Sequence, residues 1–143
     1  MRGEKKLKKI IITKSRNEKL SELLENLQKC GFDVSITSSD GNELLRAIEN
    51  EKPDILLADA FMENFDIFDF LSEFGKRLKK DGTKIFVKSA LENKRFEKRV
   101  LLRGADAYLP KPVDYRYITG EKIPAEKRIK EKLFFFRRIA VGI

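Results

Sequence analysis

Histidine and tryptophan are absent from this sequence, and cysteine occurs once, as Cys30. Without histidine or a second cysteine the chain has no zinc site of thiolates and imidazoles and no disulfide framework. It also lacks the commonest general base, which is histidine. Long apolar runs are also missing: Ile10–Ile12 is too short for a signal peptide, and no stretch approaches the roughly 18 apolar residues of a membrane span. We therefore expect a cytoplasmic protein.

Charge, in contrast, is abundant. Charged residues make up 38% of the 143 residues and the formal net charge is +8, whereas globular domains usually have about 25% charged residues. This length predicts one domain. A basic balance suits nucleic acid, acidic lipid or an acidic protein partner, or serves solubility alone. The wealth of lysine and glutamate resembles a thermophile's surface.

Short β-branched or apolar runs alternate with segments of helical periodicity. The expected strands are 10–13, 33–37, 55–58, 84–88 and 107–109, and the expected helices are 17–30, 40–52, 65–80 and 91–103. Such alternation indicates parallel strands joined by right-handed helical crossovers. The predicted fold is α/β: a doubly wound, five-stranded parallel sheet with flanking helices, in three αβα layers.

Several residues predict the helix ends. Asn17 can cap the first helix and Gly31 can end it, while Asp40 with Glu43 forms an acidic version of the capping box. After Val113 the chain is not expected to continue directly into a helix. Pro124 instead suits the first turn of a final basic and aromatic helix.

Polar side chains follow the strands at their carboxyl ends, where open parallel sheets bind ligands. Asp59 ends the third strand in DILLADAF, Lys14 and Ser15 follow the first, Ser89 the fourth and Lys111 the fifth. These strand ends would bring a carboxylate, two ammonium groups and two hydroxyls into one shallow site.

This spaced set resembles the receiver domain of two-component response regulators, the CheY-like fold. The likeness covers about residues 8–113, leaving 1–7 as a basic leader and 114–143 as a divergent last helix or extension. It implies that Asp59 occupies the phospho-acceptor position, Ser89 that of the switch hydroxyl and Lys111 that of the lysine beside the acceptor. Tyr108 would be the aromatic residue that moves with the switch.

The sequence departs from the family after the first strand. Active receivers carry an acidic pair there that helps to hold Mg²⁺, but Lys14 and Ser15 stand in the aligned positions. Exchanging two carboxylates for an ammonium and a hydroxyl removes most of the attraction for this hard cation. We expect Lys14 to pair with Asp59 in its place, with no metal and no cofactor, Mg²⁺ being needed only if the chain is a working receiver.

The first functional hypothesis is a stand-alone, atypical receiver that signals through protein contacts and is not an enzyme. Its partner would be a signalling protein, a histidine kinase or a second copy, docked on the face of the fourth helix, fifth strand and last helix. The interface candidates are Phe96, Phe134, Phe135 and Phe136. The alternatives are a conventional receiver phosphorylated on Asp59 and, ranked last, a basic nucleic-acid-associated protein.

Overall fold

The computed structural model describes residues 7–121, so the basic leader up to residue 6 and the predicted final helix, with Phe134, Phe135 and Phe136, lie outside the described residues. Strands and helices alternate in the order expected from the sequence. The elements are β1 (Lys9–Lys14), α1 (Ser21–Lys29), β2 (Asp33–Ser38), α2 (Gly41–Glu51), β3 (Ile55–Asp59), β4 (Phe61–Met62), β5 (Phe65–Asp66), α3 (Ile67–Lys80), β6 (Lys84–Ser89), α4 (Lys94–Leu102), β7 (Ala107–Pro110) and α5 (Tyr115–Thr119).

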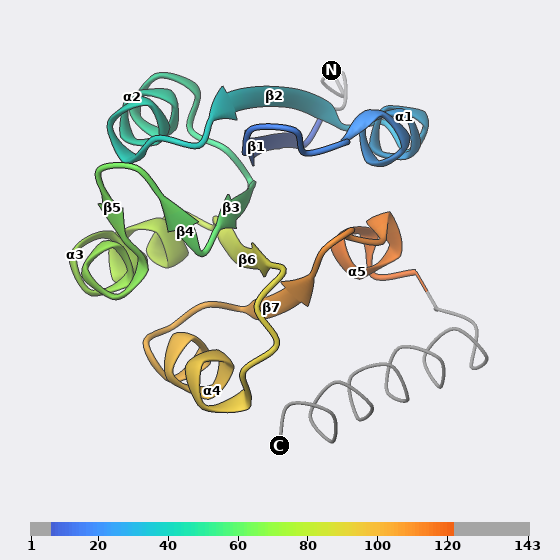
Figure 1. Ribbon diagram of the computed structural model, residues 1–143. Helices are drawn as coiled ribbons and strands as arrows, with labels where there is room; N and C mark the ends of the chain where they lie inside the picture. The colour runs from blue at the N-terminus through green and yellow to red at the C-terminus, as the bar shows by residue number, and fades with distance from the viewer. Residues whose placement is uncertain (1–6, 122–143) are drawn as a thin grey trace, which may run out of the picture.

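Five strands form one parallel sheet in the order β2-β1-β3-β6-β7, and β4 and β5 form a separate two-stranded hairpin (Figure 1). The chain winds outward from β1 to β2, crosses back to β3, and then winds outward to β7. The strand order therefore reverses between β1 and β3, which is where open parallel sheets place their ligand sites. Asp59, the last residue of β3, is in register with Lys88 of β6.

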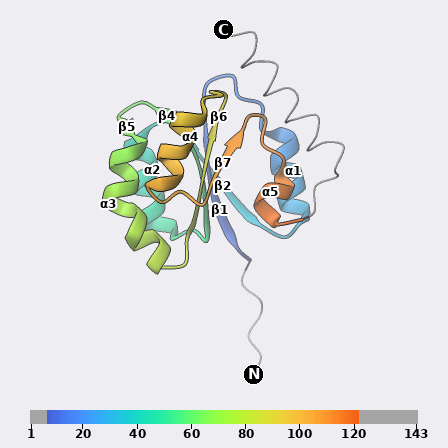
Figure 2. The same cartoon turned by 90° about the horizontal axis from the view of Figure 1, so that it is seen from below.

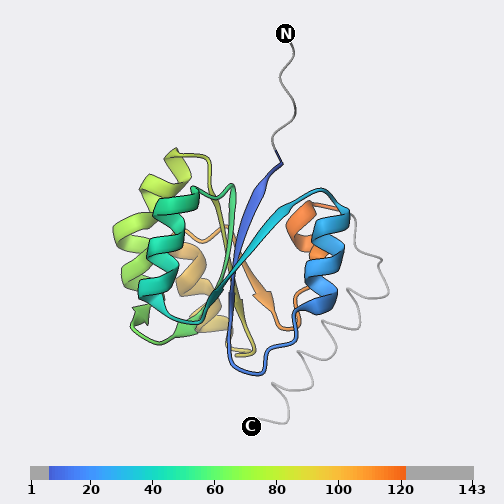
Figure 3. The same cartoon turned by 90° about the horizontal axis from the view of Figure 1, so that it is seen from above.

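Helices cover both faces of the sheet. Seen along the sheet in Figures 2 and 3, α2, α3 and α4 lie on one face and α1 and α5 on the other. Each face has its own apolar core, one around Leu56 and Val87 and the other around Ile12 and Leu57. Full burial of such an aliphatic side chain contributes about 1.5 to 3 kcal/mol. The predicted fold class and its three layers are confirmed.

Capping side chains set most of the helix starts. Asp40 accepts hydrogen bonds from the backbone N–H groups of Asn42 and Glu43, which confirms it as the cap of α2. Gly31 follows α1 with a φ of 89°, as a left-handed residue after a helix requires. The prediction that Asn17 caps α1 was wrong. Asn17 itself is left-handed, with a φ of 66°, and the helix begins at Ser21.

The segment after Asp59 differs from the prediction of one helix over residues 65–80. A tight hairpin of β4 and β5 comes first, and α3 begins at Ile67, with Asp66 as its cap. The hairpin lies close to the start of α2, where the N–H of Gly41 donates to the carbonyl of Glu63 at 2.8 Å. A Cβ on Gly41 would lie 2.3 Å from the carbonyl oxygen of Asn64, so only glycine fits this contact without a shift.

A short helix, α5, follows Val113 almost at once, so the expectation of an irregular segment there was wrong. Asp114 caps α5 through the N–H of Arg116, and Ile118 is buried against the core on the α1 side of the sheet. A five-residue helix with one buried position carries too little periodicity to be recognised from sequence. The boundary proposed at residue 113 stays a prediction.

Candidate functional site

Asp59 is buried at the carboxyl end of β3, with 2% of its surface exposed. The hydroxyl of Thr13, on the neighbouring strand β1, donates to Asp59 Oδ2 at 2.7 Å and accepts the backbone N–H of Asp59 at 2.8 Å. The other oxygen, Oδ1, accepts no hydrogen bond of regular geometry from the described residues. It lies instead 2.5 Å from Lys111 Nζ and 3.3 Å from Lys88 Nζ, so two ammonium groups neutralise it.

Lys88 is fully buried, and its side chain ends among carboxylate oxygens. Its Nζ donates to both Oε1 and Oε2 of Glu18 at 2.7 Å, in addition to its contact with Asp59. Parallel pairing of β3 with β6 sets Lys88 beside Asp59 in register. Burial lowers the pKa of Lys88, and the negative charges of Asp59 and Glu18 oppose that effect. The geometry is therefore that of a lysine held by two carboxylates.

Glu18 reaches this site from the loop between β1 and α1. Its Oε1 accepts from both the backbone N–H and the hydroxyl of Ser15, each at 3.0 Å, and lies 3.5 Å from Lys111 Nζ. Burial alone would raise the pKa of Glu18, but the hydrogen bonds from Lys88 and Ser15 and the nearby positive charges lower it below its ordinary value. Glu18 is thus held as a carboxylate.

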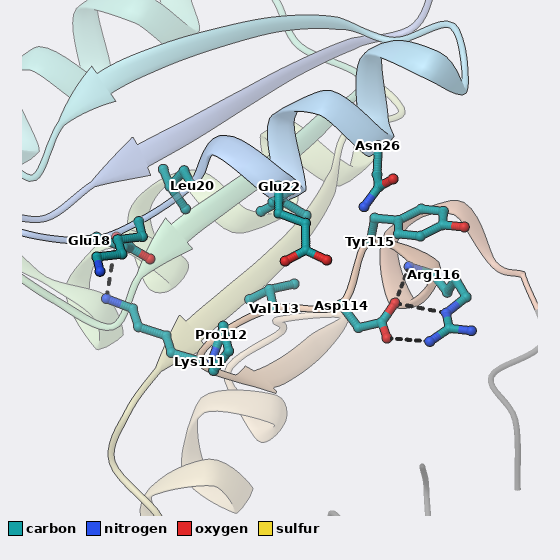
Figure 4. A pocket seen from close by; sticks show the side chains of 12 residues that line it. Glu18, Leu20, Glu22, Asn26, Lys111, Pro112, Val113, Asp114, Tyr115 and Arg116 are labelled. Carbon is teal, nitrogen blue, oxygen red and sulfur yellow. Dashed lines mark hydrogen bonds and ion pairs between the residues drawn. The ribbon is translucent and has the colours of Figure 1, made fainter. Parts of the chain in front are cut away.

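The outer edge of the site opens on a cavity of about 430 Å³ between α1 and the segment that joins β7 to α5. Figure 4 shows Lys111 reaching across to Glu18 at one end of this cavity, with Glu22 and Asp114 further along it. Lys111 keeps 22% of its side chain exposed, whereas Lys88 keeps none. Lys111 is therefore the ammonium nearer to water, and Lys88 the enclosed one.

The other residues predicted for the site lie at neighbouring strand ends. Ser89 ends β6, is buried, and its hydroxyl accepts the N–H of Leu91 at 2.9 Å. Tyr108 is 9% exposed and points inward, with its hydroxyl donating to the carbonyl of Leu91. Burial, the largest effect, raises the pKa of Tyr108, against a hydrogen bond with Ser89 that lowers it.

The prediction that Lys14 pairs with Asp59 was wrong. Lys14 is the last residue of β1 and its side chain is exposed, while the ion pairs of Asp59 within residues 7–121 are those with Lys88 and Lys111. An ammonium at a strand end stays hydrated when the interior already holds another cation. Ser15 does lie in the site, where its hydroxyl donates a hydrogen bond to Glu18 and accepts one from Lys111 Nζ at 3.3 Å.

Phe96, an interface candidate, is half-buried rather than free. Its ring stacks on Phe61 with a centroid distance of 5.1 Å and meets Phe68 and Tyr108 edge-on at 5.5 and 6.0 Å. Phe61 is the exposed member of this group, at 58%. Phe96 thus connects the core to the surface between α4 and the β4–β5 hairpin.

Lys88 and Glu18 escaped the sequence analysis. A signal existed for Lys88: in KIFVKS it shares a face with Phe86 in a strand that is buried on both sides, so its ammonium required a buried carboxylate. Glu18 gave no such signal, because a loop conformation brings it in. Sequence reasoning had expected one carboxylate facing two lysines.

The four groups form a charge-balanced network of Asp59, Glu18, Lys88 and Lys111. Within the part of the chain that the structure describes, no group of three or more His, Cys, Asp or Glu side chains could hold a metal ion. Nor is any helix of that part long and apolar enough to cross a membrane. The network can hold the loop at Glu18 against β3, β6 and the end of β7.

Comparison with known proteins concerns the family and the fold of this chain. Residues 7–121 match the family of the response regulator receiver domain. The alkaline phosphatase synthesis transcriptional regulatory protein PhoP of Bacillus subtilis (strain 168) is 33% identical over 114 residues, which cover 79% of this chain and 46% of that protein. This chain therefore spans less than half the length of that relative.

Solved structures show the same fold. A CheY-like response regulator receiver domain protein from Methanospirillum hungatei JF-1 is similar with a TM-score of 0.65 and 28% identity, over 90% of this chain and 94% of that one. A response regulator signal receiver domain from Bermanella marisrubri matches with a TM-score of 0.64 and 23% identity, over 80% and 94%. The chain belongs to the response regulator receiver domain family.

Proposed function

We propose that this receiver domain passes its signal by contact with a protein partner and does not use Mg²⁺-dependent phosphorylation of Asp59. One observation carries the proposal: both carboxylates of the site are already paired with the ammonium groups of Lys88 and Lys111. A buried carboxylate that is ion-paired with two ammonium groups is a poor nucleophile toward phosphorus, because its negative charge is neutralised and burial hinders the approach of a phosphodonor.

The residues at this site do not fit the Mg²⁺ ion that active receiver domains hold. Mg²⁺ requires about six oxygen ligands in near-octahedral geometry, including carboxylates that can face it. Here Lys88 Nζ lies 2.7 Å from both oxygens of Glu18 and 3.3 Å from Asp59 Oδ1. A divalent cation at that place would meet an ammonium, and the repulsion would oppose binding.

The surface around α4 supports a protein partner. Apolar side chains stand exposed there, namely Phe61, Leu91, Leu101 and Leu102. Basic side chains are also exposed on α4, including Lys94, Arg95 and Lys98. Receiver domains interact with histidine kinases and other proteins, and exposed apolar side chains accompanied by charged ones are typical of such contacts.

A conventional phospho-accepting receiver is the second candidate. It is favoured by the placement of Asp59, Ser89 and Lys111 at adjoining strand ends, with Lys111 Nζ 2.5 Å from the acceptor carboxylate. In that case Lys88 would have to leave Asp59 before metal and phosphodonor bind.

Labelling with acetyl phosphate and Mg²⁺, followed by intact mass, separates the two candidates. We expect no gain of a phosphate-sized mass in the unaltered chain, and none in the Asp59→Asn control. A gain that disappears in the control would refute the proposal and establish the second candidate.

A further inference from the structure

We propose that Lys88 is a built-in cation, which holds Asp59 and Glu18 together in place of a divalent metal and is the residue that excludes metal from the site. The inference rests on the proposed function and assigns its metal independence to one side chain. It predicts that a metal cation can bind between Asp59 and Glu18 once the ammonium group of Lys88 is removed.

The contacts of Lys88 are those of a site-filling ion. An ammonium has three N–H donors, and Nζ has three carboxylate oxygens within ion-pair distance: two of Glu18 at 2.7 Å and Asp59 Oδ1 at 3.3 Å. The side chain is fully buried. Lys111 does not play this part, because it is 22% exposed and touches Glu18 only at 3.5 Å.

The charges give the consequence of removing this ammonium. With Lys88 the four groups sum to zero; without it Asp59 and Glu18 share one lysine, and the site carries a net charge of −1. Glu18 and Lys111 line the 430 Å³ cavity, so water and a small cation can reach the vacated place. Two carboxylates with water are ligands that suit Mg²⁺ and Mn²⁺.

The test is Mn²⁺ binding, followed by electron paramagnetic resonance of the free ion, in the unaltered chain and in Lys88→Met. Methionine keeps most of the apolar stem of lysine but is one heavy atom shorter, so it removes the ammonium and leaves the place beside the two carboxylates empty. Lys88→Arg keeps a cation, and Lys84→Met removes an exposed lysine from the same strand, β6. Lys88→Met combined with Asp59→Asn or with Glu18→Gln removes one of the two carboxylates.

We expect Lys88→Met to bind Mn²⁺ at least about tenfold more tightly than the unaltered chain. Both combined variants should lose this gain, and Lys88→Arg and Lys84→Met should not show it. Should Lys88→Met be unfolded without metal, the same inference requires Mn²⁺ to restore a cooperative thermal transition.

Two results would overturn the inference, and they differ in what they say of the proposed function. If neither the unaltered chain nor Lys88→Met binds or is refolded by Mn²⁺, the inference fails while the metal-independent function stands. If the unaltered chain binds Mn²⁺ as tightly as Lys88→Met, metal and Lys88 coexist and both fail.

Discussion

The buried ion network can be tested by a double-mutant cycle between Glu18 and Lys88. Lys88→Met leaves two buried carboxylates against one lysine, and breaking a buried pair by removing one partner costs about 3 to 5 kcal/mol. Glu18→Gln keeps the shape and an acceptor for Ser15, so it should cost less, about 2 to 3 kcal/mol. Both side chains are well enclosed, at 0% and 10% exposure, so water compensates little.

The double variant Glu18→Gln with Lys88→Met removes one charge of each sign. Asp59 then keeps Lys111 at 2.5 Å and the Thr13 hydroxyl at 2.7 Å, and the site is balanced again. The double variant should therefore be more stable than the sum of the two losses predicts, with a coupling energy of about 2 kcal/mol.

Urea denaturation without added metal measures all three variants. Lys84→Met is the matched control on the same strand, and because Lys84 is exposed its free energy of unfolding should change by no more than about 0.5 kcal/mol. A coupling energy below about 0.5 kcal/mol would refute the argument, since Glu18 and Lys88 would then act independently.

Three further predictions concern stability. The pKa of Glu18 is lowered from 4.5 in the folded chain, so its stabilising contribution is complete above pH 4.5 and is lost as pH falls through the folded value. The free energy of unfolding from urea titrations should therefore fall less steeply with acid in Glu18→Gln than in the unaltered chain. Parallel plots of this free energy against pH would contradict the prediction. Gly41→Ala places a Cβ 2.3 Å from the carbonyl oxygen of Asn64 and should cost about 2 kcal/mol. Gly75→Ala in α3 meets nothing within 4 Å and should gain about 0.5 to 1 kcal/mol; equal melting temperatures of the two glycine variants would show the contact at Gly41 to be soft.

Local patterns were sufficient for the fold. The β-branched run of Ile10–Ile12 and the apolar run before Asp59 each predicted a strand, and both runs are almost fully buried. Alternation with amphipathic helices then limited the topology to a doubly wound parallel sheet. The start of α1 and the short helix α5 could not be predicted, because one depends on the turn at Ser15–Glu18 and the other on a single buried residue, Ile118.

The site was only half predictable. Asp59 and Lys111 follow strands, and strand ends of a parallel sheet meet at one edge, so the chain order alone brought them together. The other partners of Asp59 were not predicted. Lys14 was expected to pair with it, whereas the structure has Lys88 and Thr13 there. A side chain at a strand end turns inward only where its neighbours leave a buried charge or hydrogen-bonding group without a partner, and the sequence does not show where that is.

By itself the sequence determined the alternation of strands and helices, the carboxylate at the end of β3 and the lysine after β7, since these follow from periodicity and spacing along the chain. Only the tertiary structure decided that Glu18 turns inward and meets Lys88. Their contact spans 70 positions and exists because burying one charge is unfavourable until an opposite charge is buried beside it.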